Sequence, residues 1–239
     1  MAGGVKGSTG RPDGRATRWE GQRERRRAEF AEAAITAIER YGPDVLTEQI
    51  AAEAGVARPR LYRHFEGKAD LQHTVCQRIV RRLMAELAPV WRAGGSPNEI
   101  ITSAIDTIVR WLGTHRQLYR YLVRHSRRDP AGRGDAITDF TGTFAVNLGR
   151  LLAGALRAAG LDERGMEPFA FGLVAFVEAA IGRWLAEAEG GTAEQFTAEL
   201  ARSVWRLIEG MLGERGLRPD PERPLPDSAG IDLLDPNPH

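Results

Sequence analysis

The sequence predicts an all-α protein with a three-helix helix-turn-helix domain at its N-terminal end. Between the two terminal segments no strand-like alternation runs for more than a few residues, whereas apolar residues recur at spacings of three and four. Prolines and glycine pairs break this pattern into segments. We therefore expect helices over residues 20–40, 47–54, 58–64, 68–92, 98–113, 115–127, 133–159, 166–189 and 192–214.

The two ends of the chain differ in composition from the part between them. Residues 1–19 are rich in glycine and arginine and almost free of apolar side chains, so we expect a flexible basic arm. Residues 217–239 hold six of the thirteen prolines and predict a disordered tail. Between these ends we expect a helix-turn-helix domain at 20–66 and a second helical domain at 67–216.

Length and composition exclude several classes of protein. The chain has 239 residues, 42% of them hydrophobic, and can bury a core in two lobes. Its single cysteine, Cys76, excludes an intramolecular disulfide and a cysteine-based zinc site. The N-terminal end lacks an apolar signal core, and Glu178 and Arg183 interrupt the longest apolar stretch. We therefore expect a soluble cytoplasmic protein that does not bind a membrane.

The charge is distributed unevenly along the chain. The formal net charge is only +1, from 33 basic and 32 acidic residues. Residues 1–82 carry 16 basic against 11 acidic side chains, which leaves 17 against 21 for the rest. A basic front half on a mildly acidic back half predicts a head that binds a polyanion, joined to a body with another task.

The segment TEQIAAEAGVARPRLYRHF, residues 47–65, has the pattern of two helices joined by a tight turn. Thr47 is a candidate N-cap of the first helix. Gly55 can adopt the left-handed conformation that ends a helix, and Pro59 suits the first turn of the next one. The segment is therefore predicted to form a helix-turn-helix.

The second of these helices carries most of the polar and charged side chains that can bind a partner. Leu61 and Phe65 supply its inward contacts, and nearly all its other side chains are polar or charged. Arginine can bond guanine O6 and N7 in a bidentate manner, while tyrosine, histidine and lysine reach phosphate oxygens, so such a helix suits the DNA major groove. The alternative is an ordinary solvated helix. The polar residues are Arg58, Arg60, Tyr62, Arg63 and His64.

The run from Arg27 to Leu71 resembles the DNA-binding domain of the TetR (tetracycline-repressor-like) family of transcriptional regulators. The shared pattern is T-x-x-I-A-x-x-A-G-V, then L-Y-x-H-F, then G-K-x-x-L at the start of a fourth helix. By this resemblance Thr47 contacts phosphate, Pro59 lies in the reading helix between two arginines that face base edges, and three residues grip the DNA backbone; Arg63 could do either. The base-facing residues are Arg58 and Arg60, and the backbone residues are Tyr62, His64 and Lys68.

Two positions depart from the family pattern. Ala57 stands where a capping serine or threonine is usual, and arginines flank Pro59 where smaller side chains are usual. The two arginines predict half-sites that contain guanine. Arg60→Ala is expected to relax selectivity at one position, whereas equal weakening of all DNA would assign Arg60 to phosphate.

A second set of arginines precedes or opens the first helix, where cations oppose the helix dipole. We expect this arm to follow the DNA backbone or minor groove, as N-terminal arms do in other helix-turn-helix proteins. The alternative is a solvated tail. The set comprises Arg11, Arg15, Arg18, Arg23, Arg25, Arg26 and Arg27.

The resemblance implies a homodimer whose C-terminal helices also bind a small molecule. The helix after Pro168 is apolar almost all round, and one stripe of small residues on it predicts either an interface or a close internal contact. With apolar residues of the last helix it could form a four-helix dimer bundle. The expected interface comprises Gly172, Ala175, Ala179 and Gly182 of the stripe with Phe196, Leu200, Val204, Leu207 and Met211.

Apolar and aromatic residues of the second domain are candidates to line an effector pocket, the alternative being plain core. Asn147 and Glu178 are the polar groups available to orient a ligand, and a buried Glu178 would need Arg183 or Arg150 as a partner. Such a lining predicts a mainly apolar effector, lipid-like or aromatic. The apolar candidates are Met84, Leu87, Trp91, Ile105, Ile108, Trp111, Leu112, Phe140, Phe144, Leu148, Phe171 and Val174.

No enzyme motif stands out in the sequence. It contains no Walker phosphate loop, no G-x-S-x-G, no H-E-x-x-H and no dinucleotide fingerprint, so we expect no catalysis, no cofactor and no metal. The sequence thus predicts a one-component transcriptional repressor that binds a palindromic double-stranded operator as a homodimer and is released by a small ligand. The alternatives are a constitutive or architectural DNA-binding protein without effector, and a ligand-binding protein or enzyme whose basic head binds another polyanion.

Overall fold

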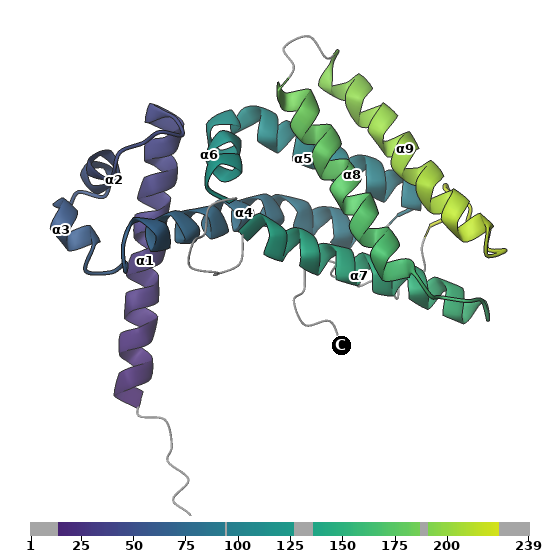
Figure 1. The fold of residues 1–239 in the computed structure, drawn as a ribbon, viewed down its shortest axis with the longest axis horizontal. Coiled ribbons are helices and arrows are strands. Elements are labelled where there is room, and N and C mark those ends of the chain that lie inside the picture. Colours follow the sequence, from purple (N-terminus) through teal and green to yellow (C-terminus); the bar gives the residue numbers. More distant parts are fainter. Residues whose placement is uncertain (1–13, 94, 127–135, 187–190, 225–239) are drawn as a thin grey trace, which may run out of the picture.

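The computed structural model describes residues 14–93, 95–126, 136–186 and 191–224, and these ranges form nine α-helices and no strand (Figure 1). The predicted all-α class is therefore confirmed, and each expected helix is present. The helices are α1 (Gly14–Tyr41), α2 (Thr47–Glu53), α3 (Arg58–Leu61), α4 (Lys68–Ala93), α5 (Pro97–Thr114), α6 (Arg116–Ser126), α7 (Ala136–Ala158), α8 (Met166–Ala186) and α9 (Ala193–Gly213).

A small N-terminal head comprises α1, α2, α3 and the beginning of α4, and lies at the left of Figure 1. Each element contributes apolar side chains to one shared core. Ala34 and Ile38 of α1, Leu61 of α3 and Val75 of α4 are fully buried, and Ile50 of α2 is nearly so. Short helices such as α2 and α3 are marginal alone, so this packing is what stabilises them.

The first helix begins earlier than the sequence predicts. It runs from Gly14, so residues 14–19, expected to belong to a flexible arm, are helical. Residues 14–41 contain seven arginines, six alanines and five glutamates, which have high helix propensity, and no proline. Helix propensity therefore extends the element beyond its apolar stripe, whose first buried residue is Phe30. Residues 1–13 of the predicted arm lie outside the described residues.

The turn between α2 and α3 has the predicted geometry at Gly55, which takes a φ of 64°. The Gly55 N–H donates to the carbonyl of Ala52 at 3.0 Å and the Val56 N–H to that of Ala51 at 2.9 Å, the two bonds of a Schellman motif. The expected N-cap role of Thr47 is wrong, because Leu46 occupies the cap position. The Leu46 N–H instead donates to the Gln49 side chain at 2.8 Å.

The helix α3 is shorter than expected. It ends at Leu61 rather than at residue 64, and the chain continues as a turn in which the His64 N–H donates to the Leu61 carbonyl at 3.0 Å. This tighter turn leads the chain inward, where Phe65 is buried in the head core. We call residues 58–65, which comprise α3 and this turn, the recognition segment.

The remaining helices form the body at the right of Figure 1, where α7 packs along α8 and α5 packs along α9. The long helix α4 belongs to both parts and continues through Pro89 to Ala93. Side chains cap two of the body helices: the Ser96 hydroxyl accepts from the Glu99 N–H at the start of α5, and the Thr192 hydroxyl accepts from the Gln195 N–H at the start of α9.

The predicted tail is tied to the body at its beginning, contrary to the expectation of disorder from residue 217. The Asn98 N–H donates to the carbonyl of Pro221 at 3.1 Å, and the Asn98 side chain donates to Glu222 at 2.8 Å. Leu217 packs against the core. A proline lacks an N–H but keeps its carbonyl, so a proline-rich segment can still cap the start of α5. Residues 225–239 lie outside the described residues.

Ion pairs connect α1 to α4 and to the junction between α5 and α6. Glu32 pairs with both Arg78 and Arg82 of α4. Burial alone would raise the pKa of Glu32, but the hydrogen bonds from the two arginines outweigh it and hold the pKa below its usual value. At the other end of α1, Glu39 lies 2.6 Å from the His115 ring, between α5 and α6. The head therefore contacts the body along most of the second half of α1.

Candidate DNA-binding surface and helical body

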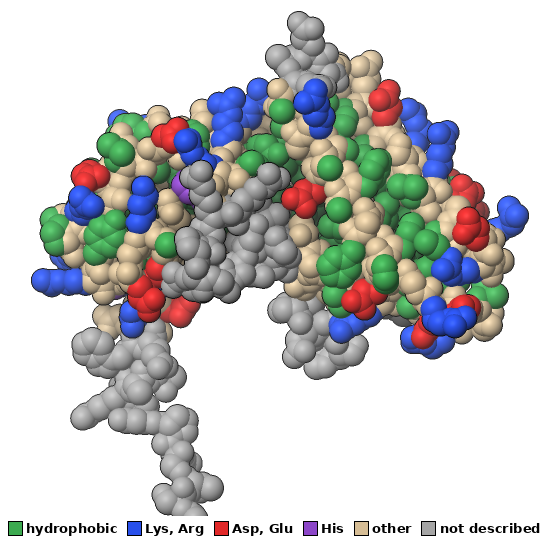
Figure 2. Space-filling model, in the orientation of Figure 1, with side chains coloured by type: hydrophobic (Ala, Val, Ile, Leu, Met, Phe, Trp, Pro, Cys, Tyr) green, Lys and Arg blue, Asp and Glu red, His purple; other side chains and the backbone are tan. Residues whose placement is uncertain are grey.

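The recognition segment presents its charged side chains to solvent. Leu61 is fully buried and anchors it, whereas Arg58, Pro59, Arg60 and Arg63 are exposed. Lys68, at the start of α4, is exposed as well, and Tyr62 and His64 are half-buried. Figure 2 shows Lys and Arg side chains at the left margin of the molecule, over the head. The structure thus brings all the expected base-facing and backbone-facing residues into one small region.

One side of the recognition segment faces α2. The Arg58 guanidinium donates to Glu48 of α2 at 2.7 Å and lies 5.6 Å from the centre of the Tyr62 ring. The Tyr62 hydroxyl lies 3.4 Å from that of Thr47, which is buried. Arg58, Tyr62 and Thr47 therefore form one group with a restricted geometry on the α2 side.

The other side of the recognition segment faces α1. The His64 ring packs against Phe30 of α1, with ring centres 5.3 Å apart. Burial lowers the pKa of His64, and the positive charges of Arg26, Arg23, Arg60 and Arg27 lower it further. The imidazole is consequently neutral at pH 7, inside a strongly positive local field. Arg58 and Arg60, which the sequence pattern groups together, point to opposite sides.

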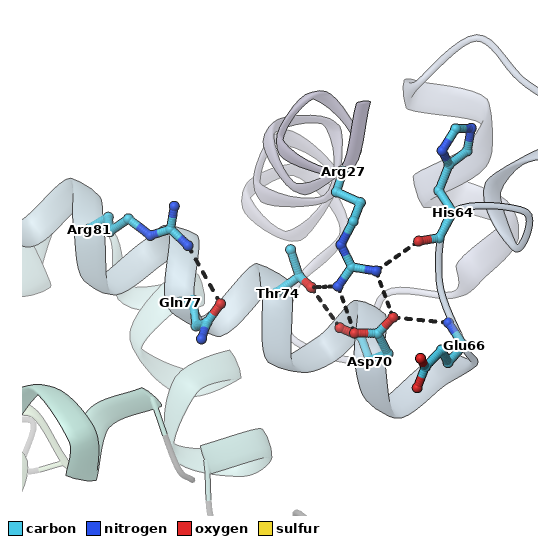
Figure 3. Close-up of polar contacts among 7 residues, drawn as sticks. All are labelled: Arg27, His64, Glu66, Asp70, Thr74, Gln77 and Arg81. Carbon is cyan, nitrogen blue, oxygen red and sulfur yellow. Dashed lines mark hydrogen bonds and ion pairs between the residues drawn. The ribbon is translucent and has the colours of Figure 1, made fainter. Parts of the chain in front are cut away.

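A polar cluster holds the recognition segment in place (Figure 3). The Arg27 guanidinium donates to both oxygens of Asp70, at 2.7 Å each, and to the carbonyl of His64 at 2.7 Å. Asp70 also accepts from the Glu66 N–H at 2.9 Å, and Arg27 donates to the Thr74 hydroxyl at 2.8 Å. One side chain of α1 therefore fixes the end of the recognition segment to the start of α4. Arg27, which the sequence pattern groups with the DNA-contacting arm, thus has a structural role that the pattern did not predict.

The geometry of the head has the features of a major-groove reader: a short exposed helix with arginines, flanked by groups that can bond phosphates on both sides. The family model of the bacterial regulatory proteins of the tetR family matches residues 31–75, which include this unit. An HTH-type transcriptional regulator of Mycobacterium tuberculosis strain H37Rv, itself uncharacterised, is 30% identical over 188 residues, or 78% of this chain and 79% of the relative. The chain belongs to the TetR family of transcriptional regulators. Members of the TetR family bind DNA and are typically not enzymes.

Solved structures of TetR-family proteins share this fold across head and body. A tetR-family transcriptional regulator from Streptomyces coelicolor has a TM-score of 0.57 at 19% identity, covering 81% of this chain and 86% of its own. The regulator FadR from Bacillus subtilis, solved in complex with stearoyl-CoA, also has a TM-score of 0.57, at 16% identity and with 76% and 97% coverage. At these identities the likeness concerns the fold alone.

Most of the expected pocket residues of this TetR-family chain lie on helices that pack together. They come from α4, α5 and α7, and all are buried or half-buried: Met84, Leu87, Trp91, Ile105, Ile108, Trp111, Leu112, Phe144, Asn147 and Leu148. Trp91 and Phe144 are in ring contact, with centres 5.5 Å apart. The Trp91 indole N–H is buried and has no hydrogen-bond partner among the described residues. The side chain of Phe140 lies outside the described residues.

Two expected pocket residues lie elsewhere. Phe171 and Glu178 of α8 are exposed, so the expectation that they line an internal pocket with the others is contradicted, and Glu178 needs no buried partner. The buried residues of α8 are Met166, Ala170, Leu173 and Ile181, at successive separations of four, three and eight residues, which places them on one side of the helix. The sequence could not fix this phase because α8 is apolar on every side. Val174, between the two faces, is half-buried.

The expected interface residues divide into an internal and an exposed set. Leu200 and Val204 of α9 are buried within the chain, and Gly182 lies so close to the Tyr119 hydroxyl that a Cβ there would be 2.9 Å from it. These three are therefore internal contacts rather than free surface. Phe196 is half-buried and stacks on Trp184 at 4.9 Å, and Met211 is half-buried beside Arg215. The exposed set is Gly172, Ala175, Ala179 and Leu207.

Together with the exposed members of the stripe, two phenylalanines form what we call the outer face of α8: Phe171, Gly172, Ala175, Phe176 and Ala179. Phe171 is 43% exposed and Phe176 40%. Among the described residues, α8 is the one helix long and apolar enough to cross a membrane by length and composition, and only 17% of that apolar window is buried. An apolar helix with so much open surface in a single chain is unusual for a soluble monomer.

The described residues contain no group of three or more His, Cys, Asp or Glu that could hold a metal ion.

Proposed function

We propose that this TetR-family regulator is a cytoplasmic repressor that binds a palindromic operator as a homodimer and is released by a small, mainly apolar ligand. The observation that carries the DNA-binding part is the recognition segment, fixed by Arg27 and Asp70 and exposing its arginines. Base reading falls to Arg58. Arg58 is held by Glu48 and by the Tyr62 ring, and a restrained guanidinium loses less freedom on binding guanine than a mobile one.

The groups flanking the recognition segment suit contacts to the two DNA backbones. Thr47 and Tyr62, whose hydroxyls are 3.4 Å apart, suit a phosphate on the α2 side. His64 and Lys68 suit phosphates on the opposite side, because they lie where the segment turns into α4. Contacts on both edges of a groove fix the depth and register of a helix within it.

Homodimer formation is supported by the outer face of α8. A second copy that placed its own outer face against this one would remove five small or aromatic residues from water on each chain. Gly172, Ala175 and Ala179 permit close helix approach, and Leu207 of α9 is a further exposed apolar residue. A twofold dimer also matches the symmetry of a palindromic operator.

An apolar effector is supported by the lining contributed by α4, α5 and α7. Its aromatic pair, Trp91 and Phe144, offers apolar surface, and the unpartnered Trp91 N–H offers one donor that a carbonyl or carboxylate oxygen of a ligand could satisfy. The similar fold of FadR from Bacillus subtilis is solved with stearoyl-CoA, so a body of this kind can hold a long acyl chain. We therefore propose a ligand with a long apolar chain and an oxygen acceptor.

The DNA part is tested by selecting binding sites from a random duplex pool and measuring the affinity for the winner and for a scrambled sequence at two salt concentrations. We expect an inverted repeat with guanine in each half-site and an affinity ratio of at least about 10³ over the scrambled duplex. Arg58→Ala should erase the preference at one base pair of each half-site. Weak, steeply salt-dependent binding without an enriched sequence would leave only attraction to polyanions and refute the operator proposal.

The ligand part is tested by thermal unfolding with stearoyl-CoA, palmitate, coenzyme A and hydrophilic metabolites. A ligand at a hundred times its Kd adds about 2.7 kcal/mol, which raises the Tm of a protein of this size by roughly 5–10 °C. Trp91→Phe should reduce the ligand-induced shift by removing the donor. The stabilising ligand should also release the operator. Stabilisation by hydrophilic metabolites alone contradicts the apolar effector, and stabilisation without release indicates a DNA-binding protein without this control.

A further inference from the structure

A small hollow lies between α1 and the recognition segment. It has a volume of about 100 Å³ and is lined by Arg26, Glu29 and Phe30 of α1, by Ala54 and Val56 of the turn after α2, and by Arg60 and His64 of the recognition segment. Since one water occupies about 30 Å³ of liquid, the space suits a group of a few heavy atoms. We call it the α1–α3 hollow.

Positive charge surrounds this hollow from two elements. Arg26 contributes from α1 and Arg60 from α3, and His64 lines the hollow with them. Glu29 is the one carboxylate in the lining. It accepts a hydrogen bond from Arg26 at 2.7 Å, so it orients that guanidinium. Burial is the largest cause of the lowered pKa of His64, and the positive charges of Arg26, Arg23, Arg60 and Arg27 lower it further. The local charge therefore favours an anion.

We propose that the α1–α3 hollow is a seat for one phosphate of the DNA backbone, gripped by Arg26 and Arg60 beside His64. The inference rests on the proposed DNA-binding function and specifies its contacts. It makes Arg26 of α1 a DNA contact, although that residue lies outside the helix-turn-helix. It also assigns Arg60 to the backbone, whereas the sequence pattern placed it with the base readers.

Two features favour a phosphate over a base edge as the partner of Arg60. Arg60 shares the hollow with a second arginine, and two guanidiniums converging on one space match the oxygens of an oxyanion. Arg58, by contrast, projects to the α2 side, so the two arginines cannot read adjacent base edges from one face of the helix.

The experiment measures the affinity of Arg26→Ala and Arg60→Ala for the selected operator and its scrambled version over a range of salt. Each variant should bind both duplexes about tenfold or more weakly, because a charge-assisted hydrogen bond to phosphate carries no sequence information. The slope of log affinity against log salt should fall by about 0.9 for each phosphate that the variant no longer neutralises, hence twice that for a dimer. The base preference obtained by selection should stay that of the wild type.

The matched control is Arg81→Ala, an exposed arginine of α4 that donates to the Gln77 side chain and does not line the hollow. It should change affinity and salt slope less than Arg26→Ala does. Relaxed preference at one base pair by Arg60→Ala, with an unchanged salt slope, overturns the assignment and makes Arg60 a base reader. Wild-type protein that selects no sequence at all refutes the proposed function instead, so the two failures are distinguishable.

The pH dependence of operator binding gives an independent readout. A phosphate beside His64 would offset the surrounding arginines and favour the protonated ring, so binding takes up a proton. Affinity should therefore rise as the pH falls from 8 through the pKa of His64 in the complex, and level off below its lowered pKa in the free protein. His64→Gln should remove this rise. The charged groups facing the ring are Arg23, Arg26, Arg27, Glu29 and Arg60, and an unchanged pH slope in His64→Gln would place the phosphate away from the ring.

Discussion

Asp70→Ala is expected to destabilise the protein by about 3 kcal/mol and to lower its Tm by roughly 6–12 °C. The Arg27 side chain is 23% exposed and that of Asp70 only 10%. Removing the carboxylate leaves a mostly buried guanidinium and the Glu66 N–H without their acceptor. Breaking one partner of a buried pair is costly for this reason, because the remaining charge keeps its desolvation penalty.

The same substitution should weaken operator binding even where the protein remains folded. Arg27 holds the His64 carbonyl only while Asp70 orients its guanidinium, so the end of the recognition segment would lose its anchor. Asp106→Ala is the matched control, since Asp106 forms an exposed pair with Arg110 on α5 at 3.1 Å. That variant should lose at most about 0.5 kcal/mol and keep wild-type DNA binding. Equal Tm values for the two variants would contradict a structural role of Asp70.

The helices of this protein follow from local patterns that the sequence displays directly. Gly55 lies where the left-handed conformation is needed, and its φ of 64° agrees with that expectation. The predictions are wrong where an element depends on helix propensity or on a contact with a distant part of the chain, because the spacing of apolar residues shows neither. The start of α1 depends on helix propensity rather than on an apolar stripe, and the segment around Pro221 is held by Asn98, which lies 123 positions earlier in the chain. No periodicity encodes such a contact.

The sequence predicts which residues form the candidate site but not which way their side chains point. The resemblance brings Arg58 and Arg60 together as neighbours in sequence, yet a short helix turns them towards α2 and α1 respectively. Arg27 does carry a usable signal in the sequence: it lies four and seven residues before Ala31 and Ala34, in phase with the buried stripe of α1. An arginine in phase with a buried stripe requires a partner. That this partner is Asp70 only the fold determines.

The largest error of the sequence-based prediction concerns which side of α8 faces the core. A helix that is apolar all round has no phase from which to infer which side faces the core. The sequence therefore predicts Phe171 and Glu178 inside, while the structure buries Leu173 and Ile181. An apolar helix of this kind gains from neighbours on several sides. Within the described part of the chain, however, only 17% of its apolar window is buried, and the outer face stays exposed.

Phe176→Asp is expected to convert the proposed homodimer into a monomer at micromolar concentration. In the dimer this carboxylate would be buried in an apolar interface without a cation, at a cost of several kcal/mol. Light scattering or sedimentation equilibrium gives the mass directly. Val123→Asp is the matched control, because Val123 of α6 is 41% exposed against 40% for Phe176 and lies off the outer face of α8. This control variant should remain dimeric.

A monomeric variant should lose the gain in operator affinity that comes from binding two half-sites at once. A tethered second head binds at an effective concentration that increases avidity by about 10² to 10⁴, so Phe176→Asp should weaken binding to the inverted repeat by at least about a hundredfold. Affinity for a single half-site should stay unchanged, since Phe176 lies on the outer face of α8, a helix that packs mainly against α7 and α9. This pair of results separates dimer loss from misfolding, which would weaken both duplexes. A Phe176→Asp protein that stays dimeric would show that the dimer forms through another surface.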